Sequence, residues 1–427
     1  MRPRVLAWVV AAVFLPLLGA ESAFATDPPG GTQAISQCAC SQQSADASST
    51  STQTKPTNQN ISVDVLSPGN TTGPVTQINS SAAASAAGNK NTTDQTASQD
   101  PPSGGSTQAI GQQAGNDQSA SATSTSTQDH PTNQNISVHV LSPGSNTGPV
   151  TQVNSSAALA AAGNSNDTSQ TANQTAGGGA GQQVIDQSAK NDQTADATAT
   201  STQDHPKNQN IQVDVLSPGS SSGPVTQVNS SAALALAGNA NSTDQSASQD
   251  PTCGCGGGGA TQVIDQQAFN KQDASADATS TQKGAENTNA PVSLGFGDCG
   301  CDGHMKDGGY DKKPSCGCGG GSSDPSGGGS VTQANLSAAL ALAGNKNSTD
   351  QNANQYLGGS GQQVIAQQAF NFQDANADAD STQYHLTNSN FPTWGSGGSV
   401  TQLNASLAFA LAGNLNKTKQ EADQTQG

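Results

Sequence analysis

Two blocks of residues alternate along this chain, and their regularity limits the possible folds more than any other feature. One block, termed A, begins at Gln33, Gln108, Gln183, Gln262 and Gln363, and the other, termed B, begins at Gln77, Gln152, Gln227, Gln333 and Gln402. The first three units repeat every 75 residues. A fixed period of this kind is typical of repeat architectures, in which each unit buries its core against its neighbours. The predicted units span residues 26–103, 104–179, 180–252, 253–358 and 359–427, and the fourth contains a Gly- and Cys-rich insertion at 283–330.

Within each block, the residue type is fixed at every second position and varies in between. Alternate side chains of a β-strand face the same side, so this pattern predicts strands, whereas a helix would fix every third or fourth position. Most of the fixed residues carry amides or are alanine and serine. We expect the amides to form structural ladders, for which the third unit provides Gln183, Gln187, Asn191, Gln193, Asn229, Asn239, Asn241 and Gln245.

The fixed A series resembles the fixed B series read backwards. If the two run in opposite directions, Ser51 lies opposite Ser81 and, across the next connection, Asn91 lies opposite Asn116. Antiparallel neighbouring strands would bring like residues together in this way. We therefore predict an all-β, repetitive up-and-down antiparallel β-meander of about ten long strands, coiled or stacked as a solenoid. A parallel β-solenoid and a largely disordered chain are the alternatives.

Two details of these strands lead to further expectations. Strands of more than about 20 residues are unusually long, and the Gly-Asn pair in every B block, such as Gly88-Asn89, predicts a bend. Between the blocks of the first unit, Ile61, Val63 and Val65 share the parity of the fixed A series. This parity predicts that the three apolar side chains face the interior.

The composition argues against several classes of protein. Leu, Ile, Val and Phe make up about 12% of the residues after position 25, below the roughly 20% under which chains tend to lack a folded core. The formal net charge is −17 and the only arginines are Arg2 and Arg4, so we expect no nucleic-acid partner. No catalytic triad, carboxylate pair or phosphate-binding loop stands out, and we predict neither enzyme activity nor a cofactor.

The N-terminus has the features of a targeting segment. Arg2 and Arg4 precede an apolar run, and the small-x-small triplet Ala23-Phe24-Ala25 follows it. Residues 1–25 are therefore predicted to be a cleaved signal peptide. No later stretch approaches the roughly 18 apolar residues of a membrane helix. We expect an extracellular or cell-surface protein without an integral membrane segment in the mature chain.

All eight cysteines lie in Cys-x-Cys pairs. Their even number in an exported chain favours disulfides, and the disulfide candidates are Cys38, Cys40, Cys253, Cys255, Cys299, Cys301, Cys316 and Cys318. The alternative for the last four is a zinc or copper site, with His304 nearby. Cys38 and Cys40 lie on the variable face of the first strand, where they could link two molecules.

The variable positions are interpreted as a solvent-facing surface. Acidic stripes on the A blocks indicate a solvated face that limits aggregation, with weak Ca²⁺ binding as the alternative; they comprise Asp192, Asp196, Asp273, Asp277, Asp374, Asp378 and Asp380. His130, His139 and His205 occupy positions that differ between units, which favours exposure. Threonines such as Thr198 and Thr200 project together and suggest ice binding, although the intervening strands of a meander would interrupt the array. Leu234 and Leu236 belong to an apolar stripe on the B blocks, which predicts either a second core layer or a surface for self-association.

The segment Gly238-Asn239-Ala240-Asn241-Ser242-Thr243-Asp244-Gln245, with Ile264-Asp265-Gln266-Gln267-Ala268 after it, resembles the Gln/Asn-spaced repeats of bacterial curlin-like functional amyloids. The resemblance covers fragments of each block and implies an extracellular matrix fibre. Together with the repeats, it predicts a secreted structural protein of a bacterial surface or matrix that self-assembles through β-strand ladders, with copies of itself or other matrix components as partners. The alternatives are a monomeric β-repeat adhesin or ice-binding protein, and a disordered coat polymer.

Overall fold

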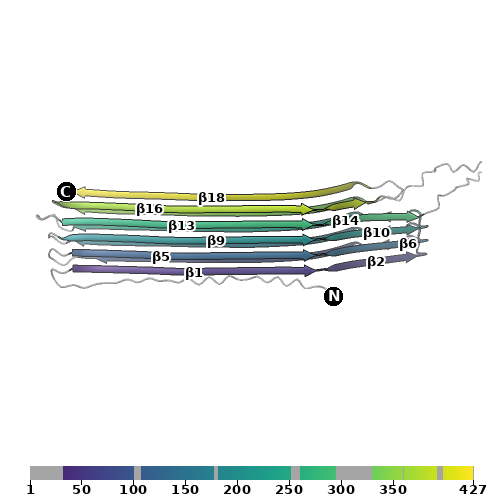
Figure 1. Cartoon of the computed structure of the whole chain (residues 1–427), viewed down its shortest axis with the longest axis horizontal. Helices are drawn as coiled ribbons and strands as arrows, with labels where there is room; N and C mark the ends of the chain where they lie inside the picture. The colour runs from purple at the N-terminus through teal and green to yellow at the C-terminus, as the bar shows by residue number, and fades with distance from the viewer. Residues whose placement is uncertain are drawn as a thin grey trace, which may run out of the picture.

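The chain winds five times around one axis as a flattened, two-layered coil of β-strands (Figure 1). The structure is a computed structural model that describes residues 32–100, 107–176, 181–251, 260–294, 329–358, 360–391 and 398–426. The predicted signal peptide lies outside the described residues, as do His304 and all the cysteines except Cys38 and Cys40.

Each coil consists of one long strand, a shorter strand that continues it, and a long strand that returns in a second layer. The outgoing strands form the A sheet: β1 (Thr32–Thr54), β5 (Thr107–Asp129), β9 (Gln182–Asp204), β13 (Ala260–Lys283) and β16 (Gly361–Tyr384). Their continuations form the tip sheet: β2 (Thr57–Val65), β6 (Thr132–Val140), β10 (Lys207–Val215), β14 (Glu286–Leu294) and β17 (Thr387–Asn390). The returning strands form the B sheet: β4 (Val75–Gln99), β8 (Val150–Ala176), β12 (Val225–Pro251), β15 (Val331–Leu357) and β18 (Val400–Gln426). The short strands β3 (Thr71–Thr72), β7 (Asn146–Thr147) and β11 (Ser221–Ser222) form a fourth sheet at the turns.

The predicted antiparallel meander is wrong, because all four sheets are parallel. β1 pairs with β5 and not with β4, in a register that places Gln33 beside Gln108 and Ser51 beside Ser126. A and B strands do run in opposite directions, but they lie in different layers and do not share a hydrogen-bonded ladder. The parallel β-solenoid named as the alternative describes the chain.

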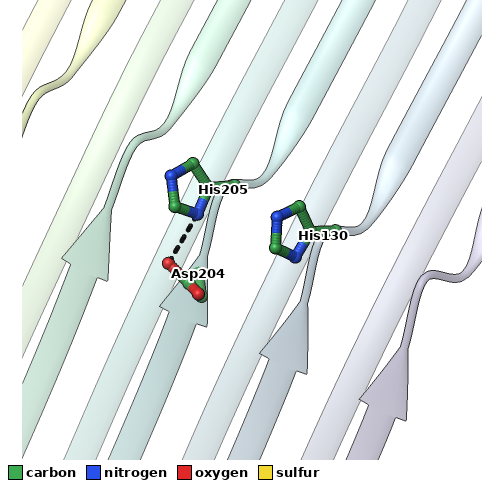
Figure 2. A group of neighbouring side chains, drawn as sticks. All are labelled: His130, Asp204 and His205. Carbon is green, nitrogen blue, oxygen red and sulfur yellow. Dashed lines mark ion pairs between the residues drawn. The ribbon is translucent and has the colours of Figure 1, made fainter.

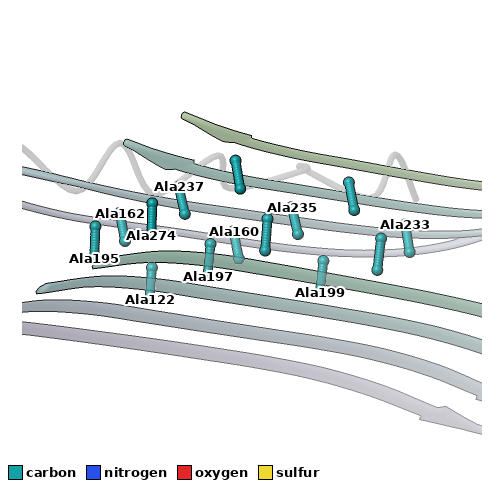
Figure 3. Packing of buried hydrophobic residues seen from close by; sticks show 14 of the residues in the cluster. Ala122, Ala160, Ala162, Ala195, Ala197, Ala199, Ala233, Ala235, Ala237 and Ala274 are labelled. Carbon is teal, nitrogen blue, oxygen red and sulfur yellow. The ribbon is translucent and has the colours of Figure 1, made fainter. Parts of the chain in front are cut away.

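The two long sheets pack face to face on small side chains. The largest apolar cluster contains only alanines, contributed by both layers, and Ala160, Ala195, Ala197 and Ala235 are at most 1% exposed. Figure 3 shows methyl groups from A strands such as β9 reaching between those of B strands such as β8 and β12. A second cluster combines Ile110, Ile185 and Ile264 of the A sheet with alanines of the B sheet. The fixed A and B positions therefore point into the space between the layers.

The side-chain alternation reverses where each A strand meets its tip strand. Lys55, His130, His205, Gly284 and His385 adopt positive φ angles between 47° and 61° at this junction. One residue in the left-handed region interrupts the two-residue alternation of a strand. As a consequence Ile61, Val63 and Val65 are 54–60% exposed, and the prediction that they face the interior is wrong. The inward positions hold Asn, Ser, Gln, Asp and His instead.

The predicted bend at the Gly-Asn pairs is also absent from the B strands. β4, β8, β12, β15 and β18 run through these pairs as uninterrupted strands of 25 to 27 residues. The direction of the chain changes instead at the positive-φ junctions and at turns such as the one at Gly69, where φ is 72°. Among the described residues, no helix has the length and apolarity needed to cross a membrane.

Candidate functional site

Ladders of amide side chains run along the coil axis through its interior. The eight ladder residues predicted in the third unit are all less than 5% exposed. Each donates its amide to the equivalent residue of a neighbouring coil over 2.8 to 3.0 Å. A parallel register stacks each residue directly on its equivalent, so the ladders lie within one sheet and not between an A and a B strand.

Backbone carbonyls of the opposite layer hold these amides in one orientation. Gln187 donates from Nε2 to Gln112 Oε1 at 2.8 Å and also to Ser246 O of the B sheet at 3.1 Å. The second bond requires the nitrogen to face the opposite layer, which leaves Gln187 Oε1 to accept from Gln266 Nε2 at 2.8 Å. Buried polar groups are costly when unsatisfied, and this arrangement satisfies both the nitrogen and the oxygen of the Gln187 amide.

The interior ladders have a direction along the axis. Interior glutamines donate toward the first coil, as in the series from Gln402 to Gln333, Gln227, Gln152 and Gln77. Interior asparagines donate toward the last coil, as in the series from Asn60 to Asn135, Asn210, Asn289 and Asn390. The two ends of the coil therefore differ in the groups that they present.

Both ends are open within the described part of the chain. β1, β2 and β4 are edge strands at the first coil, and β16, β17 and β18 are edge strands at the last coil. At the last coil the asparagine series ends on the amide nitrogen of Asn390 and the glutamine series ends on the amide oxygen of Gln402. At the first coil they end on the oxygen of Asn60 and the nitrogen of Gln77. Each group on one end thus has its hydrogen-bonding complement on the other.

Two histidines and two aspartates gather on the surface at the A-sheet junctions. His130 and His205 lie in neighbouring coils with their rings stacked at 4.8 Å, and each is about half exposed (Figure 2). His205 Nδ1 lies 2.7 Å from Asp204 Oδ1, and His130 Nδ1 contacts Asp129 in the same way. Ligand atoms of His130, Asp204 and His205 all lie within 4.8 Å of one another. Two imidazoles and a carboxylate suit Zn²⁺, Ni²⁺ or Cu²⁺, and a metal ion here would compete with the contacts to Asp129 and Asp204.

His139 and two aspartates form a buried cluster that the sequence pattern did not predict. The His139 side chain is 0% exposed, and its Nδ1 lies 2.6 Å from Asp214 Oδ1 in the next coil. Its Nε2 lies 3.5 Å from Asp64 Oδ2 in the preceding coil. The prediction of an exposed position was wrong because the alternation reverses at the junction. The signal available in the sequence was the charge pattern, since one histidine alternates with two aspartates at one repeat position.

Cys38 and Cys40 lie on the outer face of β1, and both are exposed free thiols. Their sulfur atoms are 3.4 Å apart, and this contact, with some burial, raises the pKa of the Cys38 thiol. The other disulfide candidates and the predicted metal set of Cys299, Cys301, Cys316, Cys318 and His304 lie outside the described residues.

The chain was compared with protein families, curated proteins and solved structures, and none of the three comparisons found a match.

Proposed function

We propose that this protein is an exported structural component of a bacterial surface or extracellular matrix, and that it assembles end to end into fibres. The opposite hydrogen-bonding character of the two ends carries this proposal. When the last coil of one molecule meets the first coil of another, Asn390 can donate to Asn60, and Gln77 can donate to Gln402. The spacing of Gln and Asn that resembles curlin-like repeats supports the same function.

Within the described residues, each end also presents unpaired strand edges of a length that favours assembly. β1 and β16 have 23 and 24 residues, and about half of the backbone groups of an edge strand point away from its sheet. Long edge strands without inward charges, prolines or bulges are templates for pairing with another chain. Stacking would continue all the long sheets across the joint and bury the partly exposed Ala375, Ala377 and Ala379 of the last coil.

The experiment blocks one end at a time. Ala47 of β1 and Ala377 of β16 occupy the same inward position in the first and last coils. Ala47→Lys and Ala377→Lys each place a charge that the open end can hydrate but a joint would bury. We expect the natural chain to form filaments with a reflection at about 4.8 Å along the axis and an axial rise of about 24 Å per molecule.

Mixing the two variants provides the decisive measurement. Neither variant alone should form filaments, whereas their mixture should give particles of twice the mass of either variant, because only one pair of compatible ends remains. Ser48→Lys, on the outer face beside Ala47, is the matched control and should leave filaments unchanged. Filaments formed by either blocked variant, or a mixture without any gain in mass, would exclude end-to-end assembly.

Ice binding is a second candidate function, favoured by the placement of the threonines. The A strands are neighbours in one sheet, so Thr50, Thr125, Thr200 and Thr279 form an uninterrupted outward rank, with a second rank two residues along. The B strands therefore do not interrupt the threonine array, as they would in a meander. Ice recrystallisation with the natural chain and with Thr125→Lys/Thr200→Lys tests this candidate; equal recrystallisation with both proteins would exclude it.

A further inference from the structure

The outer face of the B sheet has a groove that runs along the coil axis through all five coils, and an apolar ridge beside it whose large side chains belong to the second to fifth coils. The ridge consists of two outward ranks: Ala84, Leu159, Leu234, Leu340 and Phe409, and Ala86, Ala161, Leu236, Leu342 and Leu411. The groove has a glycine floor formed by Gly88, Gly163, Gly238, Gly344 and Gly413, and its volume is about 830 Å³. Phe409 and Leu411 are 50% and 57% exposed.

The coil itself does not require glycine at these positions. None of the five glycines has a positive φ. A Cβ added to Gly238 would lie 3.5 Å from Gly344 O, which is an ordinary contact, and one added to Gly413 would meet nothing within 4 Å. A Cβ at Gly163 would lie 3.4 Å from Gly238 O, and one at Gly88 would lie 3.3 Å from Gly163 O, which requires a shift of a few tenths of an ångström in the first coil. Glycine weakens a strand, and a glycine inside a strand often marks the close approach of another chain.

We propose that this face pairs with the same face of a second copy, ridge into groove. Two-fold symmetry about an axis parallel to the coil, passing between the Leu236 rank and the Gly238 rank, places each ridge in the other molecule's groove. The same operation sets Leu234 opposite Ala240 and Phe409 opposite Leu415, which are apolar pairs at equal height, whereas Ala84 faces Lys90 and Leu340 faces Lys346. Both lysines lie near the edge of this surface, where their ammonium groups can reach water.

The size of the surface fits a stable pair. Five strands about 4.8 Å apart and ten residues at about 3.3 Å each give the strip between the ranks of Ala232 and Ser242 an area of about 800 Å². Two such strips bury about 1,600 Å², the size of a standard specific interface. The opposite outer face cannot pair in this way, because the A sheet exposes aspartates such as Asp196, Asp277 and Asp378. The acidic faces would therefore lie on the outside of the pair.

The symmetry has a consequence for fibres. Rotation about an axis parallel to the coil keeps both molecules pointing the same way, so end-to-end stacking can continue in both at once. A rotation about an axis along the strands would reverse one molecule and place ridge against ridge. The pairing predicts fibres two molecules wide with parallel polarity, but it does not depend on end-to-end assembly.

The test uses the full chain with both ends blocked by Ala47→Lys/Ala377→Lys. Sedimentation equilibrium should show a dimer at micromolar concentration. Adding Gly163→Val, Gly238→Val and Gly344→Val should fill the groove and weaken dimerisation at least tenfold, without lowering the melting temperature because valine favours strands. Leu236→Lys/Leu342→Lys should weaken it equally from the ridge. Thr226→Val, on the same face of β12 outside the strip, is the matched control and should leave the dimer unchanged.

The outcomes separate this inference from the proposed function. A monomeric end-blocked chain, or a dimer that tolerates both the groove and the ridge substitutions, would overturn the pairing even if the natural chain forms filaments. Association of the end-blocked chain with lipid vesicles in place of a dimer would overturn it as well. Conversely, the natural chain could form dimers that are sensitive to these substitutions but no filaments. This result would support the pairing and exclude end-to-end assembly.

Discussion

The imidazole of His139 donates to Asp214 in the next coil, with 2.6 Å between Nδ1 and Oδ1 and no exposed surface on the histidine. Asp64 lies on the other side of the ring, 3.5 Å from Nε2 to the nearer oxygen. His139 therefore lies between two carboxylates that belong to the coils on either side of its own. Removing one partner of a buried charge pair typically costs about 3 to 5 kcal/mol.

We therefore expect His139→Ala to lower the free energy of unfolding by about 3 kcal/mol, measured by chemical denaturation. Asp64→Asn/His139→Asn/Asp214→Asn should recover most of this loss, because it creates an asparagine ladder like that of Asn60, Asn135 and Asn210. A His139→Ala protein as stable as the natural one would show that the cluster contributes nothing to stability.

A single break in an amide ladder should lower the free energy of unfolding by more per substituted residue than removal of the whole ladder. Gln187→Leu leaves Gln112 Oε1 and Gln266 Nε2 each without one partner, and we expect a loss of about 2 kcal/mol or more. Replacing all five glutamines of this rank by leucine removes both partners at each step and should cost less per residue. Ser188→Ala, on the outer face beside Gln187, is the control, and denaturation midpoints provide the comparison.

Sheet spacing depends on the absence of large side chains between the layers. Ala197 is 1% exposed and belongs to the alanine cluster. Ala197→Leu forces extra methylene groups into a filled interior, and overpacking of this kind costs about 1 to 3 kcal/mol. Thr198→Leu, which adds similar bulk to the outer face, should change the melting temperature little. Equal melting temperatures for Ala197→Leu and the natural chain would indicate that the layers can separate freely.

The acidic outer face of the A sheet should make stability depend on pH. Burial and the neighbouring carboxylates Asp273 and Asp277 raise the pKa of Asp196 above its usual value of 3.8. A raised pKa in the folded state means that the folded protein binds more protons than the unfolded chain in this window, so stability falls as pH rises through it. We expect Asp196→Asn to raise the melting temperature at neutral pH and to reduce its slope between the usual Asp pKa and neutrality. An unchanged slope would show that other groups cause the dependence.

Much of the interior followed from the sequence, because alternation with a period of two reports directly which side chains share a face. Ser51 and Ser81 were predicted to lie opposite each other, and their hydroxyl oxygens are 2.9 Å apart. Asn91 and Asn116, paired by the same rule, are hydrogen-bonded. Both contacts, however, join residues across the interior and not within a sheet. The tip side chains were misassigned because nothing in the alternation signalled a positive φ at residues as different as Lys55, His130 and Gly284.

The sequence by itself determined that the chain is a repeat of strands, that amides and alanines face inward, and that A and B strands run in opposite directions. Only the tertiary structure decided which strands share backbone hydrogen bonds. The physical reason is that the reversed pattern determines which side chains lie opposite each other. It does not determine whether their strands are joined by backbone hydrogen bonds. Opposed strands bring Ser51 to Ser81 in the same register whether they lie side by side in one sheet or face to face across an interior. In the coil the backbone bonds go to the equivalent strand one repeat away, as from β1 to β5, and this leaves an unpaired edge at each end of the part of the chain that the structure describes.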